Sequence, residues 1–245
     1  MPGYRRCDFM STYLYPTKKR ILIITGHYGS GKTEFAVSLA MRLAREPVRL
    51  YPRLSVVDLD IVNPYFRSRE RMDMLENENV KVYGGIYKTE ITAELPELAA
   101  DIRAPLEDKG CRVIVDAGGN DSGSKALIQF GKYFTPAETA VLAVLNFNRF
   151  ETRDIDSAVA HVRAIEVMTG LTVEGIVNNT HLLRETTAEM IIEGHRLSVA
   201  FCEKTGKVLW CDCYPEQYVA AEALKGLSDY LMPLGLYMRP TWLDK

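Results

Sequence analysis

Several features that would assign this chain to a special class of protein are missing or scarce. Only five of its 245 residues are cysteine, an odd number, so a disulfide framework is not expected. Residues 1–20 mix basic and aromatic side chains without the hydrophobic core of a secretory signal. No apolar run approaches the roughly 18 residues that a membrane span needs. We therefore expect a cytoplasmic protein without a membrane span.

Strong charge and low-complexity segments are also missing. The formal net charge is -2, which leaves no excess of basic residues for a general nucleic-acid or membrane surface. No repeat or linker divides the chain, and 47% of its residues are hydrophobic, enough for one sizeable core. We expect a single domain over residues 20–245. Residues 1–19 would be an N-terminal extension that is either disordered or packs as an extra edge segment.

Apolar runs alternate with amphipathic segments along the chain. Continuous apolar runs such as residues 140–145 are typical of strands buried on both faces, and hence of parallel sheets covered by helices. We predict strands at 21–25, 55–59, 80–83, 112–116, 139–145, 172–178 and 207–212. We predict helices at 33–45, 67–76, 96–107, 152–169 and 186–205, with one or two short ones after residue 216. The expected fold is α/β, with three layers around a mostly parallel sheet.

The most informative motif lies between the first strand and the first helix. It matches the pattern G-x-x-x-x-G-K-[ST] and consists of Gly26, His27, Tyr28, Gly29, Ser30, Gly31, Lys32 and Thr33. In a strand–loop–helix setting, which continues here at Glu34, backbone N–H groups wrap a polyphosphate at the helix N-terminus. Lys32 would then reach the β- and γ-phosphates, and the Thr33 hydroxyl would bind Mg²⁺. The motif predicts nucleotide binding.

Two predicted strands end in acidic residues. Asp116 follows a buried strand and precedes Gly118 and Gly119; a carboxylate there can hold a Mg²⁺-bound water, and the Gly119 amide, or that of Gly118, can sense a γ-phosphate. Asp58 and Asp60 end another strand on the same side. One of them could orient an attacking water while the other positions the lysine or the metal; capping of the next segment is the alternative.

The order of these motifs resembles the ParA/MinD-like group of P-loop ATPases. That order is a phosphate loop, D-x-D, D-x-G-G and then a strand ending in asparagine. The resemblance extends in architecture over residues 20–231, and its specific motifs occupy a small part of them. It implies a P-loop NTPase fold in which Asp60 lies in switch I and activates the hydrolytic water, and Asp116 opens switch II.

The resemblance also implies a purine site. An asparagine after the strand at 175–178 would bond the base; Asn178 matches best and Asn179 is the close second. A loop at residues 213–216, with Pro215, would cover the base. The resemblance implies adenine, and residues 178–181 lack the N-K-x-D pattern.

One departure from the group concerns its signature lysine at the second position of the phosphate loop. This chain has His27 there, followed by the bulky Tyr28. The resemblance alone implies a possible homodimer, and this departure counts against one built around the nucleotide.

Other candidate residues have two interpretations each. Arg67 or Arg69, in the polar segment 63–70, could neutralise transition-state charge or simply solvate a helix start. Cys211 and Cys213 could bind metal in a shared site or pack as small hydrophobes. We expect structural roles for His161, His181 and His195, and we place residues 123–125 in a switch II loop.

Together these features predict a MgATP-binding protein that hydrolyses ATP slowly and whose nucleotide state controls contacts with a partner. Lys32, Asp60 and Asp116 would be its catalytic residues, with Thr33 and Asp116 on Mg²⁺. One alternative is an ATP-dependent small-molecule ligase or kinase of the dethiobiotin synthetase-like type. The other is a non-catalytic ATP switch or metallochaperone.

Overall fold

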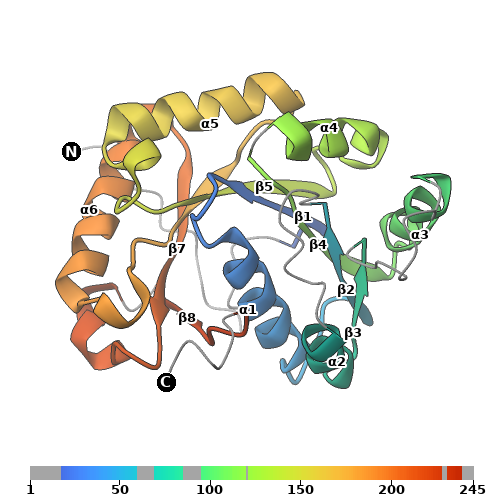
Figure 1. The fold of residues 1–245 in the computed structure, drawn as a ribbon, viewed down its shortest axis with the longest axis horizontal. Helices are drawn as coiled ribbons and strands as arrows, with labels where there is room; N and C mark the ends of the chain where they lie inside the picture. Colours follow the sequence, from blue (N-terminus) through green and yellow to red (C-terminus); the bar gives the residue numbers. More distant parts are fainter. Residues whose placement is uncertain (1–17, 60–68, 85–94, 120, 228–230, 239–245) are drawn as a thin grey trace.

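A single parallel sheet organises the molecule. The structure, a computed structural model, describes residues 18–59, 69–84, 95–119, 121–227 and 231–238. Within them the strands follow the order β3-β2-β4-β1-β5-β6-β7-β8, and all neighbours are parallel (Figure 1). The strands are β1 (Ile21–Gly26), β2 (Arg53–Asp58), β3 (Val80–Tyr83), β4 (Cys111–Asp116), β5 (Thr139–Leu145), β6 (Gly175–Asn178), β7 (Val208–Pro215) and β8 (Leu231–Leu234).

Helices cover both faces of the sheet. One face packs against α1 (Lys32–Ala44) and α2 (Arg69–Asn77), and the other against α3 (Leu95–Glu107), α4 (Asp121–Gln129), α5 (Ile155–Thr169) and α6 (Ala188–Thr205) (Figure 1). Short 3-10 helices connect them: η2 (Gly131–Tyr133), η3 (Phe150–Thr152), η4 (Leu183–Glu185) and η5 (Ala221–Leu227). The predicted α/β, three-layer architecture with a helix-covered parallel sheet is confirmed.

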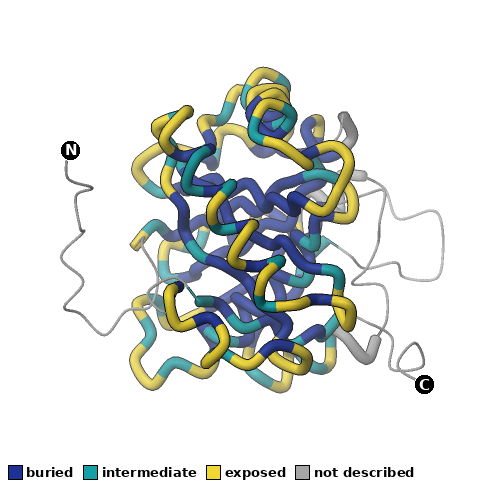
Figure 2. Tube along the Cα trace, turned by 90° about the vertical axis from the view of Figure 1, so that its left-hand side faces the viewer, coloured by how far each residue is buried: buried dark blue, intermediate teal, exposed yellow. Residues whose placement is uncertain are grey.

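Alternation along β1 shows why the layers form. Ile21 and Ile23 face the side of α3 to α6, whereas Leu22 and Ile24 face α1 and α2. Successive strand side chains point to opposite faces, so an uninterrupted apolar strand needs cover on both. Figure 2 shows the result, a buried centre with exposure confined to the outer helix faces and loops. β1 lies at the centre of the sheet, and its carboxyl end is where the phosphate loop begins.

Helices α5 and α6 begin and end with recognisable caps. Asp154 accepts a hydrogen bond from the Ser157 backbone N–H and forms a capping box for α5, which ends at Gly170 in the left-handed conformation. Thr187 caps α6 in the same way through Met190 N–H. These local signals explain why the predicted bounds of both helices are within three residues of the observed ones.

Three expectations about local structure are wrong. Residues 123–125 lie inside α4 rather than in a loop, because Leu127 and Ala126 are buried against the sheet and make a helix favourable. The strand β7 continues to Pro215 where we expected a loop at 213–216, because β8 pairs with it. The strand β8 itself was not expected, since four residues that include a proline carry little strand signal.

Some expectations lie outside the described residues. These are Asp60, Arg67 with residues 63–68 of the proposed switch I, and the N-terminal extension up to residue 17. Among the described residues, no helix is long and apolar enough to cross a membrane.

Candidate phosphate-binding site

The phosphate loop joins the central strand β1 directly to α1. Gly29 and Gly31 have φ angles of 76° and 83°, in the left-handed region that favours glycine. Gly31 is the N-cap of α1, and no side chain caps that helix start. The helix dipole favours an anion at such a helix start.

Neighbouring strand ends approach the loop so closely that only glycine fits. A Cβ on Gly26 would lie 2.5 Å from the Val144 carbonyl oxygen of β5, and one on Gly119 would lie 2.5 Å from the Gly26 carbonyl oxygen. A Cβ on Gly31 would lie 2.2 Å from Asn179 Nδ2. The carboxyl ends of β4, β5 and β6 thus surround the loop. This is the edge of a parallel sheet at which ligands bind in open α/β folds.

Two oxygen ligands of the kind that Mg²⁺ prefers meet at the base of the loop. The Thr33 hydroxyl donates to Asp116 Oδ2 over 2.6 Å, and both side chains are buried, as is Lys32. Hydroxyl and carboxylate oxygens are hard ligands that suit Mg²⁺. The structure therefore brings Thr33 into contact with Asp116, with Lys32 next to Thr33 in the chain, and the donor set fits a magnesium ion.

The second acidic strand end lies beside the first. Asp58 is the register partner of Asp116 across the β2–β4 pair, and Leu59 N–H donates to the Asp116 carbonyl over 2.8 Å. Asp58 is buried, and as the register partner of Asp116 it points to the same face of the sheet. This adjacency supports a shared role in a site at this edge of the sheet.

The two asparagines after β6 have different surroundings. Asn179 Nδ2 donates to the Ser30 carbonyl of the phosphate loop over 2.6 Å. The Asn178 amide is engaged on both sides instead, donating to Asp212 Oδ1 over 2.6 Å and accepting from the Thr180 hydroxyl over 2.6 Å. Asp212 in turn contacts His195 Nδ1 at 2.7 Å. Asn178 thus anchors a buried polar network, whereas Asn179 contacts the phosphate loop.

His181 also reaches the phosphate loop, which the sequence pattern did not indicate. Its Nε2 atom would be 4.0 Å from a Cβ on Gly31, and its Nδ1 accepts from Leu183 N–H over 3.2 Å. Burial, together with the charge of Arg149, lowers the pKa of His181 to about 4. The sequence did offer one clue: His181 follows Asn179 by two residues, in the segment after β6, whose end lies beside the loop.

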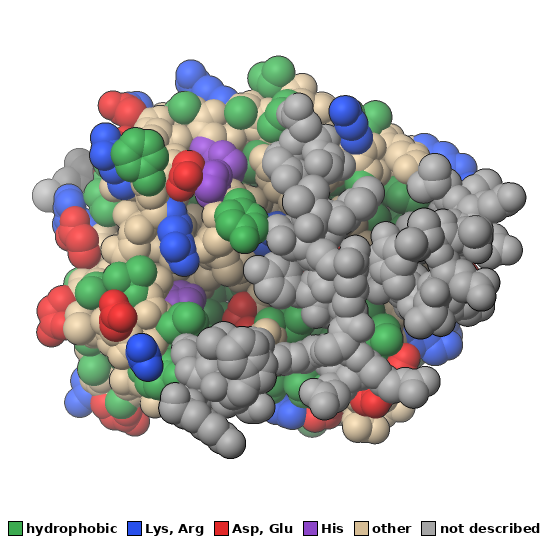
Figure 3. Space-filling view, viewed as in Figure 1, with side chains coloured by type: hydrophobic (Ala, Val, Ile, Leu, Met, Phe, Trp, Pro, Cys, Tyr) green, Lys and Arg blue, Asp and Glu red, His purple; other side chains and the backbone are tan. Residues whose placement is uncertain are grey.

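The segment after β5 supports the other side of the loop. Arg149 Nε donates to the Gly29 carbonyl over 3.1 Å. His27 donates from Nδ1 to its neighbour's carbonyl, lies 3.6 Å from Glu151 Oε2, and packs edge-on against His161 with ring centroids 5.5 Å apart. In Figure 3, histidines appear at two places on this face, with a Lys or Arg side chain between them. The His27 side chain is thus engaged by residues of its own chain.

Glu34 links the start of α1 to the C-terminal segment after β8. Its carboxylate oxygens accept from the backbone N–H groups of Tyr237 and Met238, over 2.7 and 2.8 Å. This carboxylate therefore faces protein backbone. Its own N–H group belongs to the uncapped first turn of α1.

Pro215 and the two neighbouring cysteines lie in β7. Pro215 is buried at the end of the strand, opposite Leu234 of β8. Cys213 is fully buried, and that burial raises the pKa of its thiol well above the usual range. Among the described residues no group of three or more His, Cys, Asp or Glu side chains could hold a metal ion. Cys213 belongs to the core on the α1 side of the sheet, and Cys211 is partly buried against that core.

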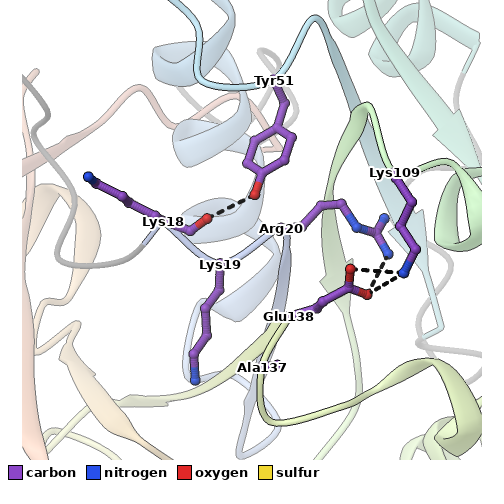
Figure 4. Close-up of a pocket in the computed structure, with 7 residues that line it drawn as sticks. All are labelled: Lys18, Lys19, Arg20, Tyr51, Lys109, Ala137 and Glu138. Carbon is purple, nitrogen blue, oxygen red and sulfur yellow. Dashed lines mark hydrogen bonds and ion pairs between the residues drawn. The ribbon is translucent and has the colours of Figure 1, made fainter.

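A hollow lies at the opposite, amino-terminal edge of the sheet. It has a volume of about 260 Å³ and is lined by Lys18, Lys19, Arg20, Tyr51, Lys109, Ala137 and Glu138. Figure 4 shows Arg20 and Lys109 directed at the Glu138 carboxylate, and Lys19 pairs with Glu174. Two carboxylates, Glu138 and Glu174, therefore offset part of the positive charge of its four cationic side chains.

Comparisons with known proteins give only distant likenesses. No family model matches the chain, and no curated protein is similar to it in sequence. Among solved structures, it is similar to the nucleotide-binding protein from Archaeoglobus fulgidus in complex with ADP, with cobalt; identity is 16%, the match covers 92% of this chain and 90% of that one, and the TM-score is 0.45.

It is also similar to chloroplast FtsY from Physcomitrella patens, with 20% sequence identity and a TM-score of 0.43; the match covers 68% of this chain and 51% of that one. The chain thus spans about half the length of that FtsY chain. Neither likeness is strong enough to assign a family or an activity. The chain's own geometry defines the fold: a parallel sheet whose central strand leads through a G-x-x-x-x-G-K-T loop into a helix is that of a P-loop NTPase.

Proposed function

We propose that this protein binds MgATP at the phosphate loop and hydrolyses it slowly, as a ParA/MinD-like ATPase whose nucleotide state controls contacts with a partner. The observation that carries the proposal is the buried contact between the Thr33 hydroxyl and Asp116 beneath an uncapped, glycine-lined helix start. Backbone N–H groups that can donate to a phosphate and oxygen atoms that can bind a metal ion then lie within one small region.

Each part of the bound nucleotide has candidate partners in this chain. Lys32 and the loop N–H groups would neutralise charge that develops on the γ-phosphate, with the Gly119 amide as a further donor. Thr33 and Asp116 would hold Mg²⁺, and Asp58 would support them. The ion, when bound, supplies positive charge to the β- and γ-phosphate oxygens.

The attacking water and the adenine base have candidate residues of their own. Asp60, which the D-x-D pattern assigns to switch I, would position the water for in-line attack. For the adenine base, Asn179 is the better candidate of the two asparagines because its amide already contacts the loop at Ser30.

The direct test is ADP release from MgATP by the wild-type protein and by Lys32→Ala, with GTP as the comparison nucleotide. We expect ATP-preferring turnover that falls to background in Lys32→Ala, because the cation facing the transferred phosphoryl group is gone. Lys132→Ala, which changes an exposed lysine of η2, is the matched control and should keep full turnover. Unchanged turnover in Lys32→Ala would contradict the assignment.

A second candidate is an ATP-dependent ligase or kinase that acts on a small molecule. It is favoured by His27, which occupies the position of the signature lysine and packs against Glu151 and His161 of its own chain. ADP release that requires an added metabolite would identify this activity. Turnover with MgATP alone would favour the ATPase.

A further inference from the structure

Three buried polar atoms beside the phosphate loop have no hydrogen-bond partner within the described part of the chain. They are Ser30 Oγ, Asn179 Oδ1 and His181 Nε2. Their side chains are nearly inaccessible, since the exposed fractions of these residues are 1%, 0% and 7%. Leaving such groups unsatisfied destabilises the folded protein. Two of them, on Asn179 and His181, lie together beside Gly31, and this grouping points to a ligand that completes their hydrogen bonds.

The hydrogen-bonding sense of two of these atoms is set by contacts elsewhere. Asn179 Nδ2 must face the Ser30 carbonyl to donate to it, so Oδ1 is an acceptor. His181 Nδ1 accepts from Leu183 N–H, so in the neutral ring the proton is on Nε2 and this atom is a donor. The ring is neutral at ordinary pH, because burial lowers its pKa to about 4.

The positions of both side chains are also constrained. Asn179 Nδ2 and His181 Nε2 are both within contact distance of a Cβ on Gly31, at 2.2 and 4.0 Å. The His181 carbonyl accepts from Asn146 Nδ2 over 3.1 Å, and Asn146 is itself buried. The loop therefore has beside it one acceptor and one donor that cannot exchange roles.

That pair of groups distinguishes between the purines. Adenine presents an amino donor at N6 beside an acceptor at N7, whereas guanine presents two acceptors, O6 and N7, on the same edge. In an anti nucleotide this edge lies on the side of the 5′-phosphates, next to the phosphate loop. A fixed acceptor beside a fixed donor matches the adenine edge and opposes the guanine edge.

We propose that His181 is a specificity-determining residue of the nucleotide site, whose Nε2–H donates to N7 of adenine while Asn179 Oδ1 accepts from the N6 amino group. This role deepens the proposed function and rests on it, because it requires a nucleotide on the phosphate loop. It replaces the purely structural role expected for His181 from the sequence.

The test compares the affinity of MgATP with that of Mg-7-deaza-ATP, in which carbon replaces N7. Calorimetric titration of the wild-type protein should show ATP binding about 10-fold tighter, the effect of one hydrogen bond to an otherwise unpaired buried donor. GTP should bind more weakly than ATP, because O6 would face Asn179 Oδ1. This comparison needs no substitution and so does not depend on the folding of a variant.

His181→Phe then assigns the contact to its residue. This variant should bind ATP only as well as 7-deaza-ATP, and its affinity for 7-deaza-ATP should equal that of the wild type, because the two changes remove the same bond. His161→Phe is the matched control, since the pKa of His161 is also about 4 but its ring lies against His27. It should leave the ratio of the two affinities unchanged.

The outcomes separate this inference from the proposed function. Equal affinity of the wild-type protein for ATP and 7-deaza-ATP would overturn the role of His181 and leave nucleotide binding standing. The same would follow if His181→Phe weakened both nucleotides equally. No binding of either nucleotide by the folded wild-type protein would overturn the proposed function itself.

Discussion

At the scale of single residues, the two asparagines after β6 show how much neighbouring side chains decide. Asn178 and Asn179 are consecutive, and the sequence pattern favours Asn178 as the residue that binds the base. In the structure Asn178 bonds Asp212 and Thr180, while Asn179 bonds the phosphate loop. Alternation along a strand sends consecutive side chains to opposite sides. Only one of them can therefore reach the loop, and we expect nucleotide affinity to depend on Asn179.

The depressed pKa of His181 predicts a loss of stability in mild acid. Its pKa is about 4 in the folded protein and 6.5 ordinarily, so below 6.5 the unfolded chain binds a proton that the folded one does not. Stability is therefore complete above that value and falls as the pH drops from 6.5 towards 4. At about pH 5 the loss from this group should be about 1–2 kcal/mol.

Urea unfolding at about pH 7.5 and about pH 5 checks this prediction. In His181→Phe the drop in unfolding free energy between the two conditions should be smaller than in the wild type. His161, whose pKa is also about 4, still titrates in the variant and preserves part of the drop. An identical pH dependence in the two proteins would contradict a buried neutral ring at His181.

At the scale of elements, Glu34 connects the helix that follows the phosphate loop to the end of the described chain. Gly235 N–H donates to the Ser38 hydroxyl over 3.2 Å, one turn along α1 from Glu34. Together with the Glu34 contacts to Tyr237 and Met238, this holds the segment after β8 against α1. A change at the start of α1 can therefore be transmitted to this segment.

Glu34→Gln should loosen that connection. The amide keeps one acceptor oxygen in place of two, so one of the charge-assisted bonds to Tyr237 or Met238 is lost. We expect hydrogen exchange of these two backbone amides to become about 10-fold faster, measured by mass spectrometry or NMR. Glu193→Gln, which changes the exposed pair with Arg196 on α6, is the control. Equal protection in wild type and Glu34→Gln would show that the contact does not hold the segment.

At the scale of the whole molecule, the site is assembled from the carboxyl ends of several strands. The loop after β1, Asp58 of β2, Asp116 of β4 and Asn179 after β6 all lie at this edge, whereas the hollow lined by Lys18 and Glu138 lies at the opposite edge, where the strands begin. Parallel strands place all their carboxyl ends on one side. The polarity of the sheet therefore determines where a ligand can be held.

Binding at this edge should stabilise the entire fold. A ligand present at about 100 times its dissociation constant adds about 2.7 kcal/mol to the free energy of unfolding, so saturating MgATP should raise the melting temperature by several degrees. Thermal denaturation of the wild type and of Lys32→Ala, with and without MgATP, measures the effect. The variant should melt near the wild-type temperature without nucleotide and show no shift. A full shift in Lys32→Ala would argue that ATP binds elsewhere.

Much of the architecture could be predicted from the sequence because its signals are local. The strands at 80–83 and 139–145 have the predicted bounds, and the other predicted strands differ at their ends by a few residues. The phosphate loop was recognisable because its glycines and lysine act through backbone geometry and nearest neighbours. The strand β8 was missed because its short sequence becomes a strand only through pairing with β7.

The sequence by itself determined the fold class and the position of the phosphate loop, since apolar periodicity and glycine spacing operate within one element. Only the tertiary structure decided which groups surround that loop. Asn179 and His181 follow β6 and are far from Gly31 in sequence, yet they lie beside it in the fold. Glu34 likewise contacts Tyr237, near the end of the chain. Contacts between distant residues depend on how strands are ordered and how loops end, and no local pattern encodes either.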